Sequence, residues 1–240
     1  MKTQLKTLIA LVAFPALTFA QTADEVIDKN IAALGGADKV AAVKTLQYDQ
    51  SLSIMGMDMT GKTSIVVGKS MRQDISIMGQ QVTNVVDGDK GWTINPMQGG
   101  STPTALPDDQ VKMQKGNANV MGADLLTAKA QKYPVEFVGK EKQGDKDVYN
   151  LKVTRPEGVA NYYVDASTYQ ITGMKATVSV QGQSGDIKLK YGGYKTIDGL
   201  TIPTTIDMET PGAPGPITIT VSNIAFNPTI DPTIFAMPTK

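Results

Sequence analysis

The stretch Leu46-Gln47-Tyr48-Asp49-Gln50-Ser51-Leu52-Ser53-Ile54 decides the fold, because most of its even positions are apolar and most of its odd positions are polar. Alternation with a period of two predicts a β-strand that turns one face toward a core. Two later stretches keep the pattern, and glycines at 56, 68 and 79 separate the strands. The apolar positions of these two stretches are Met57, Met59, Ile65 and Val67, and then Met71, Ile75 and Ile77. We therefore predict an antiparallel meander with one apolar face.

The meander continues along most of the chain. A fourth strand ends near Val86, Asp87-Gly88-Asp89 turns the chain, and Gly91-Trp92-Thr93-Ile94 begins a fifth strand. After Tyr133-Pro134 the alternation returns, with turn residues between the apolar stretches. The strands predicted there are 135–142, 146–154, 159–165, 168–180, 185–194, 200–210 and 216–226.

Helical patterns precede and interrupt these strands. Thr22 and Glu25 have the spacing of a capping box, and Gly35-Gly36 has the character of a helix end. Further short helices are predicted over 37–43, 108–115 and 125–131, with a loop marked by Gly99-Gly100, Pro103 and Pro107. No linker or repeat divides the chain, so we predict one α+β domain over residues 21–240, mostly antiparallel β.

Residues 1–20 have the three-part layout of a secretory signal peptide. Lys2 and Lys6 give a positive start, an apolar run extends from Leu8 to Leu17, and Thr18-Phe19-Ala20 supplies small residues before a cleavage site. The run is shorter than the roughly 20 residues of a lasting membrane anchor. A buried N-terminal helix is the alternative interpretation. We expect a soluble domain that is released into the periplasm.

The composition removes several classes of chemistry. The chain has no cysteine and no histidine, which excludes disulfides, thiol nucleophiles, a lipid anchor on cysteine and a Ser-His-Asp arrangement. The close acidic pairs, Asp87/Asp89 and Asp108/Asp109, stand at a turn and at a helix start, where aspartate has structural uses. The 23 basic and 23 acidic residues form no basic stripe, so we do not expect a nucleic-acid partner. We predict a protein that is not an enzyme and has no cofactor.

One motif matches a nucleotide-binding loop in form alone. Residues 56–63 fit the P-loop pattern G-x-x-x-x-G-K-[ST], which works because a helix follows and points its N-terminal amides at phosphate. Here Ser64-Ile65-Val66-Val67 follows, and β-branched residues favour a strand. We interpret the match as part of a β-strand.

Methionine is unusually concentrated, since eight of the 12 methionines lie between Met55 and Met121. Three interpretations stay open. Methionine fills irregular gaps in a core, and it also forms soft surfaces for variable apolar ligands. A third interpretation is copper, because Met55, Met57 and Met59 recur at every second residue and thioethers are soft ligands for Cu(I).

Three stretches resemble the outer-membrane lipoprotein-sorting proteins common in Bacteroidetes-type bacteria, within the wider LolA/LolB type of lipoprotein carrier. They are Ala23 to Gly36, Val85 to Pro96 around the Asp-Gly turn and the tryptophan, and Ile224 to Pro238. The resemblance spans most of residues 22–238, although each motif also makes sense as turn chemistry. It implies a strongly curved, open half-barrel sheet whose concave face is covered by helices, with acyl chains held between them.

This chain departs from the family at one functional position. The carriers have an arginine just before their third-strand region, where this chain has Lys69-Ser70. The nearest arginine is Arg72, which alternates with the apolar positions of its strand, so we predict that it points to solvent. The resemblance does not carry the role of that arginine over.

These observations predict a periplasmic, non-enzymatic carrier or binder of lipoprotein acyl chains or other lipids. We expect a monomer, with a lipoprotein transport component of the inner or outer membrane as a further candidate partner. The alternative is an envelope interaction or scaffold protein with the same fold and a filled core. The residues predicted to line an apolar cavity are Leu52, Ile54, Met57, Met59, Ile65, Val67, Ile75, Ile77, Trp92 and Ile94.

Overall fold

The computed structural model describes residues 21–54, 57–156, 158–180, 183–213 and 215–238. The predicted signal peptide, residues 1–20, lies outside the described residues. Within them, one 13-stranded antiparallel sheet dominates the fold, and β12 (Lys195–Ile197) pairs with β13 (Leu200–Ile202) in a small separate hairpin. From edge to edge the sheet contains β6 (Gly100–Ala105), β5 (Lys90–Asn95), β4 (Gln80–Asp87), β3 (Ser70–Ile77), β2 (Met57–Val66), β1 (Thr45–Ile54), β15 (Ile217–Phe226), β14 (Thr205–Glu209), β11 (Gln183–Gly192), β10 (Ile171–Val180), β9 (Gly158–Asp165), β8 (Lys146–Arg155) and β7 (Val135–Gln143).

The strand order joins two meanders through β15. β1 to β6 are neighbours in chain order, and so are β7 to β11. β15 lies between β1 and β14 and pairs with both of them. β6 and β7 are the two edges, so the sheet stays open rather than closing into a barrel. The predicted mostly antiparallel α+β class is confirmed.

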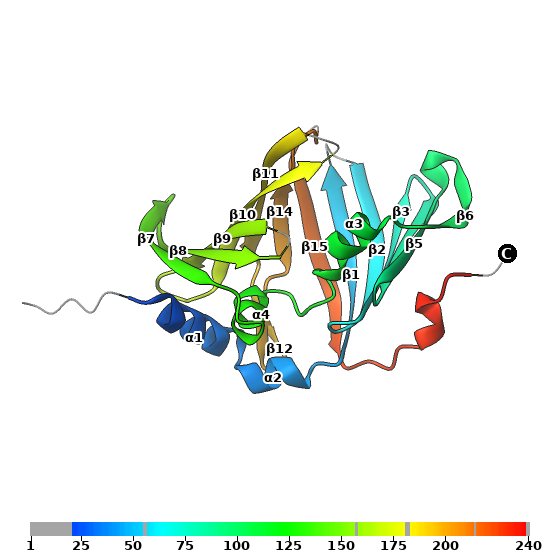
Figure 1. Cartoon of the computed structure of the whole chain (residues 1–240). Helices are drawn as coiled ribbons and strands as arrows, with labels where there is room; N and C mark the ends of the chain where they lie inside the picture. Colours follow the sequence, from blue (N-terminus) through cyan, green and yellow to red (C-terminus); the bar gives the residue numbers. More distant parts are fainter. Residues whose placement is uncertain (1–20, 55–56, 157, 181–182, 214, 239–240) are drawn as a thin grey trace, which may run out of the picture.

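Helices lie on the concave face of this curved sheet. They are α1 (Ala23–Leu34), α2 (Ala37–Ala42), α3 (Asp108–Lys115) and α4 (Asp124–Ala130). Figure 1 shows α1, α2 and α4 at the lower end of the sheet and α3 in front of β1 and β2. Two 3₁₀ turns complete the elements, η1 (Pro96–Gln98) and η2 (Pro232–Phe235). The helices therefore cover one part of the concave face and leave another part free.

Local sequence explains where α1 begins and ends. The Thr22 hydroxyl accepts a hydrogen bond from the Glu25 N–H at 3.2 Å, and the Glu25 carboxylate accepts one from the Thr22 N–H at 3.1 Å. The predicted capping box is thus confirmed. Gly35 ends the helix with φ of 122°, and a Cβ there would meet the carbonyl oxygen of Gly199 at 2.3 Å. The helix end needs glycine for both its backbone angle and its close approach to the β12–β13 hairpin.

The main core forms where α1 and α4 pack on β8, β9 and β10. Side chains from α1 and α4 meet the apolar face of these three strands, and all are buried. Fully burying one such side chain stabilises a fold by about 1.5–3 kcal/mol. The buried members are Val26, Ile27, Ile31, Leu125, Ala128, Leu151, Val153, Ala160, Tyr162, Val164 and Ile171.

The structure differs from the sequence prediction at several strand boundaries, and most clearly in two stretches. Residues 100–105 form strand β6, where we predicted a loop, because Pro103 and the glycines looked like loop residues. β6 is an edge strand, and proline is tolerated there since it does not have to donate to a second neighbour. The predicted strand 200–210 is interrupted by Pro203-Thr204, which has no strand conformation and separates β13 from β14. The Thr204 N–H donates to the carbonyl of Gly192 at 3.1 Å, which turns the chain back into the main sheet.

Asp165 stabilises the turn between β9 and β10 through four contacts. Its carboxylate accepts hydrogen bonds from the Ser167 N–H at 2.8 Å, the Ser167 hydroxyl at 2.5 Å and the Thr168 N–H at 3.0 Å. It also forms an ion pair with Lys146 at 3.2 Å. Burial acts to raise the pKa of Asp165, but these donors outweigh it and hold the pKa well below its usual range. The turn therefore depends on the ionised carboxylate.

We expect Asp165→Asn to lower the free energy of unfolding at pH 7 by about 2 kcal/mol, because the charge-assisted bonds are lost. A lowered folded-state pKa stabilises above the unfolded value of about 3.9, and this contribution fades as the pH falls toward the folded value. Urea denaturation at pH 7 and pH 3 should show the difference between parent and variant shrinking at pH 3. The matched control is Asp147→Asn, whose carboxylate pairs with Lys140 on the exposed surface. That control should leave stability nearly unchanged, because exposed ion pairs contribute little. A pH-independent difference for Asp165→Asn would contradict the prediction.

Candidate functional site

The strand register places one apolar row across the concave face. Residues directly opposite each other in antiparallel strands point to the same face. From β2 to β7, each member of the row is paired with the next, and every one is apolar or aromatic. The row consists of Met57, Ile54, Ile217, Met208, Leu189, Met174, Tyr162, Leu151 and Phe137.

The helices cover only part of this concave face. Over β7 to β10, α1 and α4 bury the row, and near the lower ends of β1 to β3 the segment after α3 buries Leu46, Ile65 and Met71 against Ala118. The upper ends of β1 to β3, β11, β14 and β15 carry apolar side chains that belong to none of the four packed clusters among the described residues. Met57 is exposed and the others are half-buried. We call this set the apolar strip: Leu52, Ile54, Met57, Met59, Ile75, Ile77, Ile187, Leu189, Ile206, Met208, Ile217 and Ile219.

Six of the ten predicted lining residues lie in the apolar strip. They are Leu52, Ile54, Met57, Met59, Ile75 and Ile77. Ile65 and Val67 point to the same face but belong to the packed part, where Ile65 is 1% exposed. The predicted site is therefore split into an uncovered half and a filled half.

Trp92 and Ile94 lie on the opposite face of the sheet, which corrects their placement in one cavity with the other eight. Trp92 is paired with Val85 and Ile94 with Thr83, whereas the concave positions of β4 are Val82, Asn84 and Val86. Trp92 packs there with Val85 and Phe235 and is 4% exposed. The fifth strand begins at a turn. The sequence alone does not show whether its even-numbered or its odd-numbered side chains lie on the apolar face of the strands before it.

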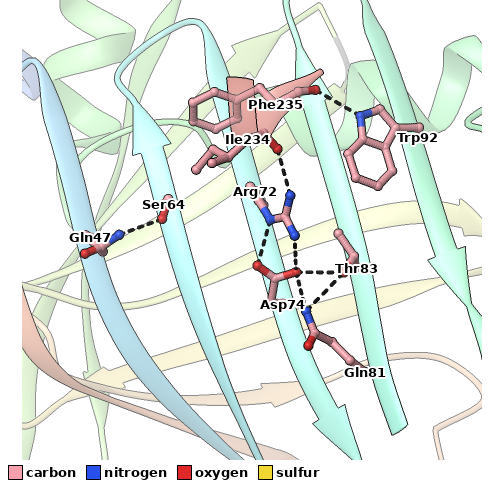
Figure 2. Close-up of polar contacts among 9 residues, drawn as sticks. All are labelled: Gln47, Ser64, Arg72, Asp74, Gln81, Thr83, Trp92, Ile234 and Phe235. Carbon is pink, nitrogen blue, oxygen red and sulfur yellow. Dashed lines mark hydrogen bonds and ion pairs between the residues drawn. The ribbon is translucent and has the colours of Figure 1, made fainter. Parts of the chain in front are cut away.

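A C-terminal segment covers Trp92 and Arg72 on that opposite face. The Trp92 indole N–H donates to the carbonyl of Phe235 at 2.9 Å, and an Arg72 guanidinium N–H donates to the carbonyl of Ile234 at 2.8 Å, as Figure 2 shows. Arg72 also donates twice to Asp74, at 2.7 and 3.0 Å. The prediction that Arg72 points to solvent was wrong in this respect, since its side chain lies under the segment that contains η2 and is only 24% exposed.

Half of the apolar strip comes from strands that the predicted list of lining residues leaves out. Ile187 and Leu189 lie on β11, Ile206 and Met208 on β14, and Ile217 and Ile219 on β15. Each pair has the same period-two spacing that identified β1, so the signal is present in the sequence. What the sequence does not show is that β15 pairs with β1, which brings these residues beside Leu52 and Ile54.

The two misleading motifs resolve differently. Residues 57–66 form β2 and no helix follows them, so the P-loop interpretation fails and the strand interpretation is confirmed. For copper, Met57 and Met59 lie on the same face of β2, while Met55 lies outside the described residues. Cu(I) binding through these thioethers stays an untested hypothesis.

A polar group lies within the packed half, where α4 begins. The Tyr162 hydroxyl donates to the Asp124 carboxylate at 3.2 Å, and Arg155 donates to the same hydroxyl at 3.2 Å. Burial raises the pKa of Asp124, although the Arg155 charge and the Tyr162 hydrogen bond act to lower it. This chain of contacts ties α4 to β8 and β9.

The opposite face of β10, β11 and β14 is polar. A hollow of about 680 Å³ there is lined by charged side chains that include Lys175, Lys188, Lys190, Asp207 and Glu209. Lys188 pairs with Glu209 at 3.2 Å. Burying an acyl chain against these groups would strip them of water without giving them new partners. The apolar strip is therefore the candidate site for an apolar ligand.

The architecture is similar to that of several solved bacterial protein structures. A LolA superfamily protein from Nitrosomonas europaea matches with a TM-score of 0.60 and 18% sequence identity, over 90% of this chain and 98% of that chain. The chain has a LolA-like fold. A DUF1329 family protein from Desulfovibrio piger matches with a TM-score of 0.59 and 15% identity, over 90% of this chain and 98% of that chain. An outer membrane lipoprotein-sorting protein domain from Vibrio parahaemolyticus matches with a TM-score of 0.57 and 12% identity, over 88% and 94% of the two chains.

The LolA-like fold confirms the resemblance that the sequence suggested, at the level of architecture. No protein-family model matches the sequence, and no curated protein sequence matches it. Among the described residues, no helix combines the length and the apolar character that spanning a membrane requires.

Proposed function

We propose that the protein is a periplasmic, non-enzymatic carrier or binder of acyl chains, which belong to lipoproteins or to free lipids. The LolA-like fold supports the general class of lipid-binding carrier. The periplasmic location rests on the signal-peptide pattern of residues 1–20. We propose a monomer as the working form, with a lipoprotein transport component of either membrane as a further partner.

The observation that carries this proposal is the uncovered apolar strip. Its residues come from six strands, lie side by side in register and keep their apolar side chains half-exposed. A contiguous exposed apolar surface of this kind marks a place where a protein meets a ligand or partner. An acyl chain laid along it would gain about 0.8 kcal/mol for each CH₂ group that it buries. Met57, Met59 and Met208 would let the surface adapt to chains of different shape.

Lipid analysis of the purified protein tests the proposal directly. We expect native mass spectrometry to detect bound acylated molecules, and solvent extraction to release them. A fluorescent fatty acid should bind the delipidated protein and be displaced by unlabelled acyl chains. If no lipid co-purifies and no probe binds, the carrier function is refuted.

The alternative of an envelope scaffold protein has one observation in its favour. The part of the concave face below α1, α2 and α4 is filled with packed side chains rather than open. A scaffold would need no ligand on the strip, so delipidated and freshly purified protein would have the same stability. We expect instead that bound acyl chains raise the melting temperature, because a ligand that binds only the folded state stabilises it.

A further inference from the structure

Three neighbouring turns at one end of the sheet carry exposed methionines. In the meander of β1 to β6, the turns β1–β2, β3–β4 and β5–β6 fall at the same end, because successive strands are antiparallel. Met57, Met78 and Met97 stand at these turns and are 53%, 79% and 49% exposed. The turn η1 packs against β4 and β6, which sets Met97 beside the β3–β4 turn. We call these three residues the methionine rim.

Folding does not explain the methionine at position 78. Ile77 pairs with Gln80, so Met78 and Gly79 form a two-residue hairpin turn, with φ of 50° and 78°. Turns with two positive φ angles favour Asn-Gly, and a methionine is strained in the left-handed region. At 79% exposure the Met78 side chain gains little from packing.

The methionine rim has almost no charge around it. The described residues of the three turns, 53–54, 57–58, 76–81 and 95–100, contain one charged side chain, Asp58. The turns at the other end of the same strands carry Lys69, Asp87, Asp89 and Lys90. Surfaces that bind anionic lipids are rich in lysine and arginine. The rim instead fits a partner whose outer surface is uncharged or zwitterionic and whose interior, just below that surface, is apolar.

We propose that the methionine rim docks on a lipid bilayer by inserting its three side chains below the headgroups, without electrostatic attraction. A zwitterionic bilayer presents that chemistry, and flexible methionine side chains adapt to it. Met57 belongs both to the rim and to the apolar strip, where it is paired with Ile54. A docked bilayer would thus lie at the open end of the strip. Met78 and Met97 lie outside the strip, so docking at their two turns can be measured apart from ligand binding.

The variant Met78→Asn separates docking from folding, because asparagine suits the turn and removes the apolar side chain. We expect the purified protein to float with phosphatidylcholine vesicles, equally at about 0.1 M and 0.5 M salt. Met78→Asn should weaken this partition about tenfold without lowering the melting temperature. Adding Met57→Gln and Met97→Gln should abolish it. Met237→Asn is the matched control, since Met237 is 45% exposed but follows η2, away from the three turns.

A fluorescence readout reports insertion itself. Trp92 is the single tryptophan of the chain and is buried, so it gives a constant background. In Met78→Trp, brominated phosphatidylcholine should quench the added emission but leave that of the parent unchanged. A Met78→Trp emission that brominated lipid does not quench would overturn insertion at this turn.

Three results of the vesicle assay would overturn the proposal: no binding of the parent, binding to anionic phosphatidylglycerol vesicles alone with loss at high salt, or unchanged binding of the triple variant. The fatty-acid displacement assay runs without vesicles. A parent protein that binds the fatty-acid probe but does not bind vesicles would therefore refute the membrane contact and leave the carrier function standing.

Discussion

Ile217→Glu should weaken the binding of a fluorescent fatty acid by about 100-fold, because it places a charge in the middle of an apolar surface. Ile217 is paired with Ile54 on one side and Met208 on the other, so the carboxylate would interrupt the apolar row between these two residues. The side chain is half-exposed in the free protein, and the charge can stay in water there. We therefore expect the free energy of unfolding to change by less than about 1 kcal/mol.

Thr220→Glu is the matched control for this substitution. Thr220 lies on the same strand, is exposed and is paired with Ser51 and Thr205 on the opposite face of the sheet. Thr220→Glu introduces the same charge on the same strand but on the face away from the apolar strip, so this variant should leave probe binding unchanged. Equal loss of binding in both variants would indicate a general effect of charge. No loss in either variant would show that the ligand does not bind on the apolar strip.

Trp92→Ala should lower the free energy of unfolding by about 3–5 kcal/mol, the usual cost of emptying a large aromatic site. The indole fills the space between Val85 and Phe235 and its N–H satisfies the carbonyl of Phe235. Both the packing and the hydrogen bond would be lost. Because Arg72 holds the same segment through the carbonyl of Ile234, we expect the C-terminal segment to loosen as a unit.

Trp92→Phe separates the two contributions, since it keeps most of the ring and loses the indole N–H. Its cost should be about 1–2 kcal/mol, measured by urea denaturation. The double variant Trp92→Ala with Phe235→Ala should cost less than the sum of the single variants, because the two side chains share one cluster. Strict additivity would show that the segment packs independently of Trp92. Hydrogen exchange of residues 230–236 should rise in Trp92→Ala and stay low in Trp92→Phe.

Much of the fold could be predicted because local rules and global structure agree. The capping box at Thr22 and Glu25 marks the start of α1, and the alternation around Leu46 shows which side chains of β1 share a face. Both signals depend only on residues that are close together in the sequence. Pro103 misled the prediction because its tolerance depends on β6 being an edge, a fact about the sheet and not about the local stretch.

The candidate site was predicted in part for the same reason. Alternation identified Leu52, Ile54, Met57 and Met59 as members of one face, and the register agrees. It did not separate them from Ile65, which the segment after α3 buries, because helix placement is a tertiary property. Trp92 was predicted on the wrong face, because the sequence does not give the register of the two strands that the Asp-Gly turn connects.

The pairing of β1 with β15 has a consequence for how the protein reaches its folded state. One whole side of β1 finds its hydrogen-bond partners in residues 217–226, so the two meanders cannot join until that distant strand has arrived. Contacts so far apart in sequence carry a high cost of chain closure and slow the search for the folded state. We expect the first meander to remain an incomplete sheet during that delay, with β1 unpaired on the side that β15 later occupies. Late closure of this kind would suit the export that we propose, because a chain crosses a membrane unfolded and β1 would stay exposed to a chaperone until β15 pairs with it.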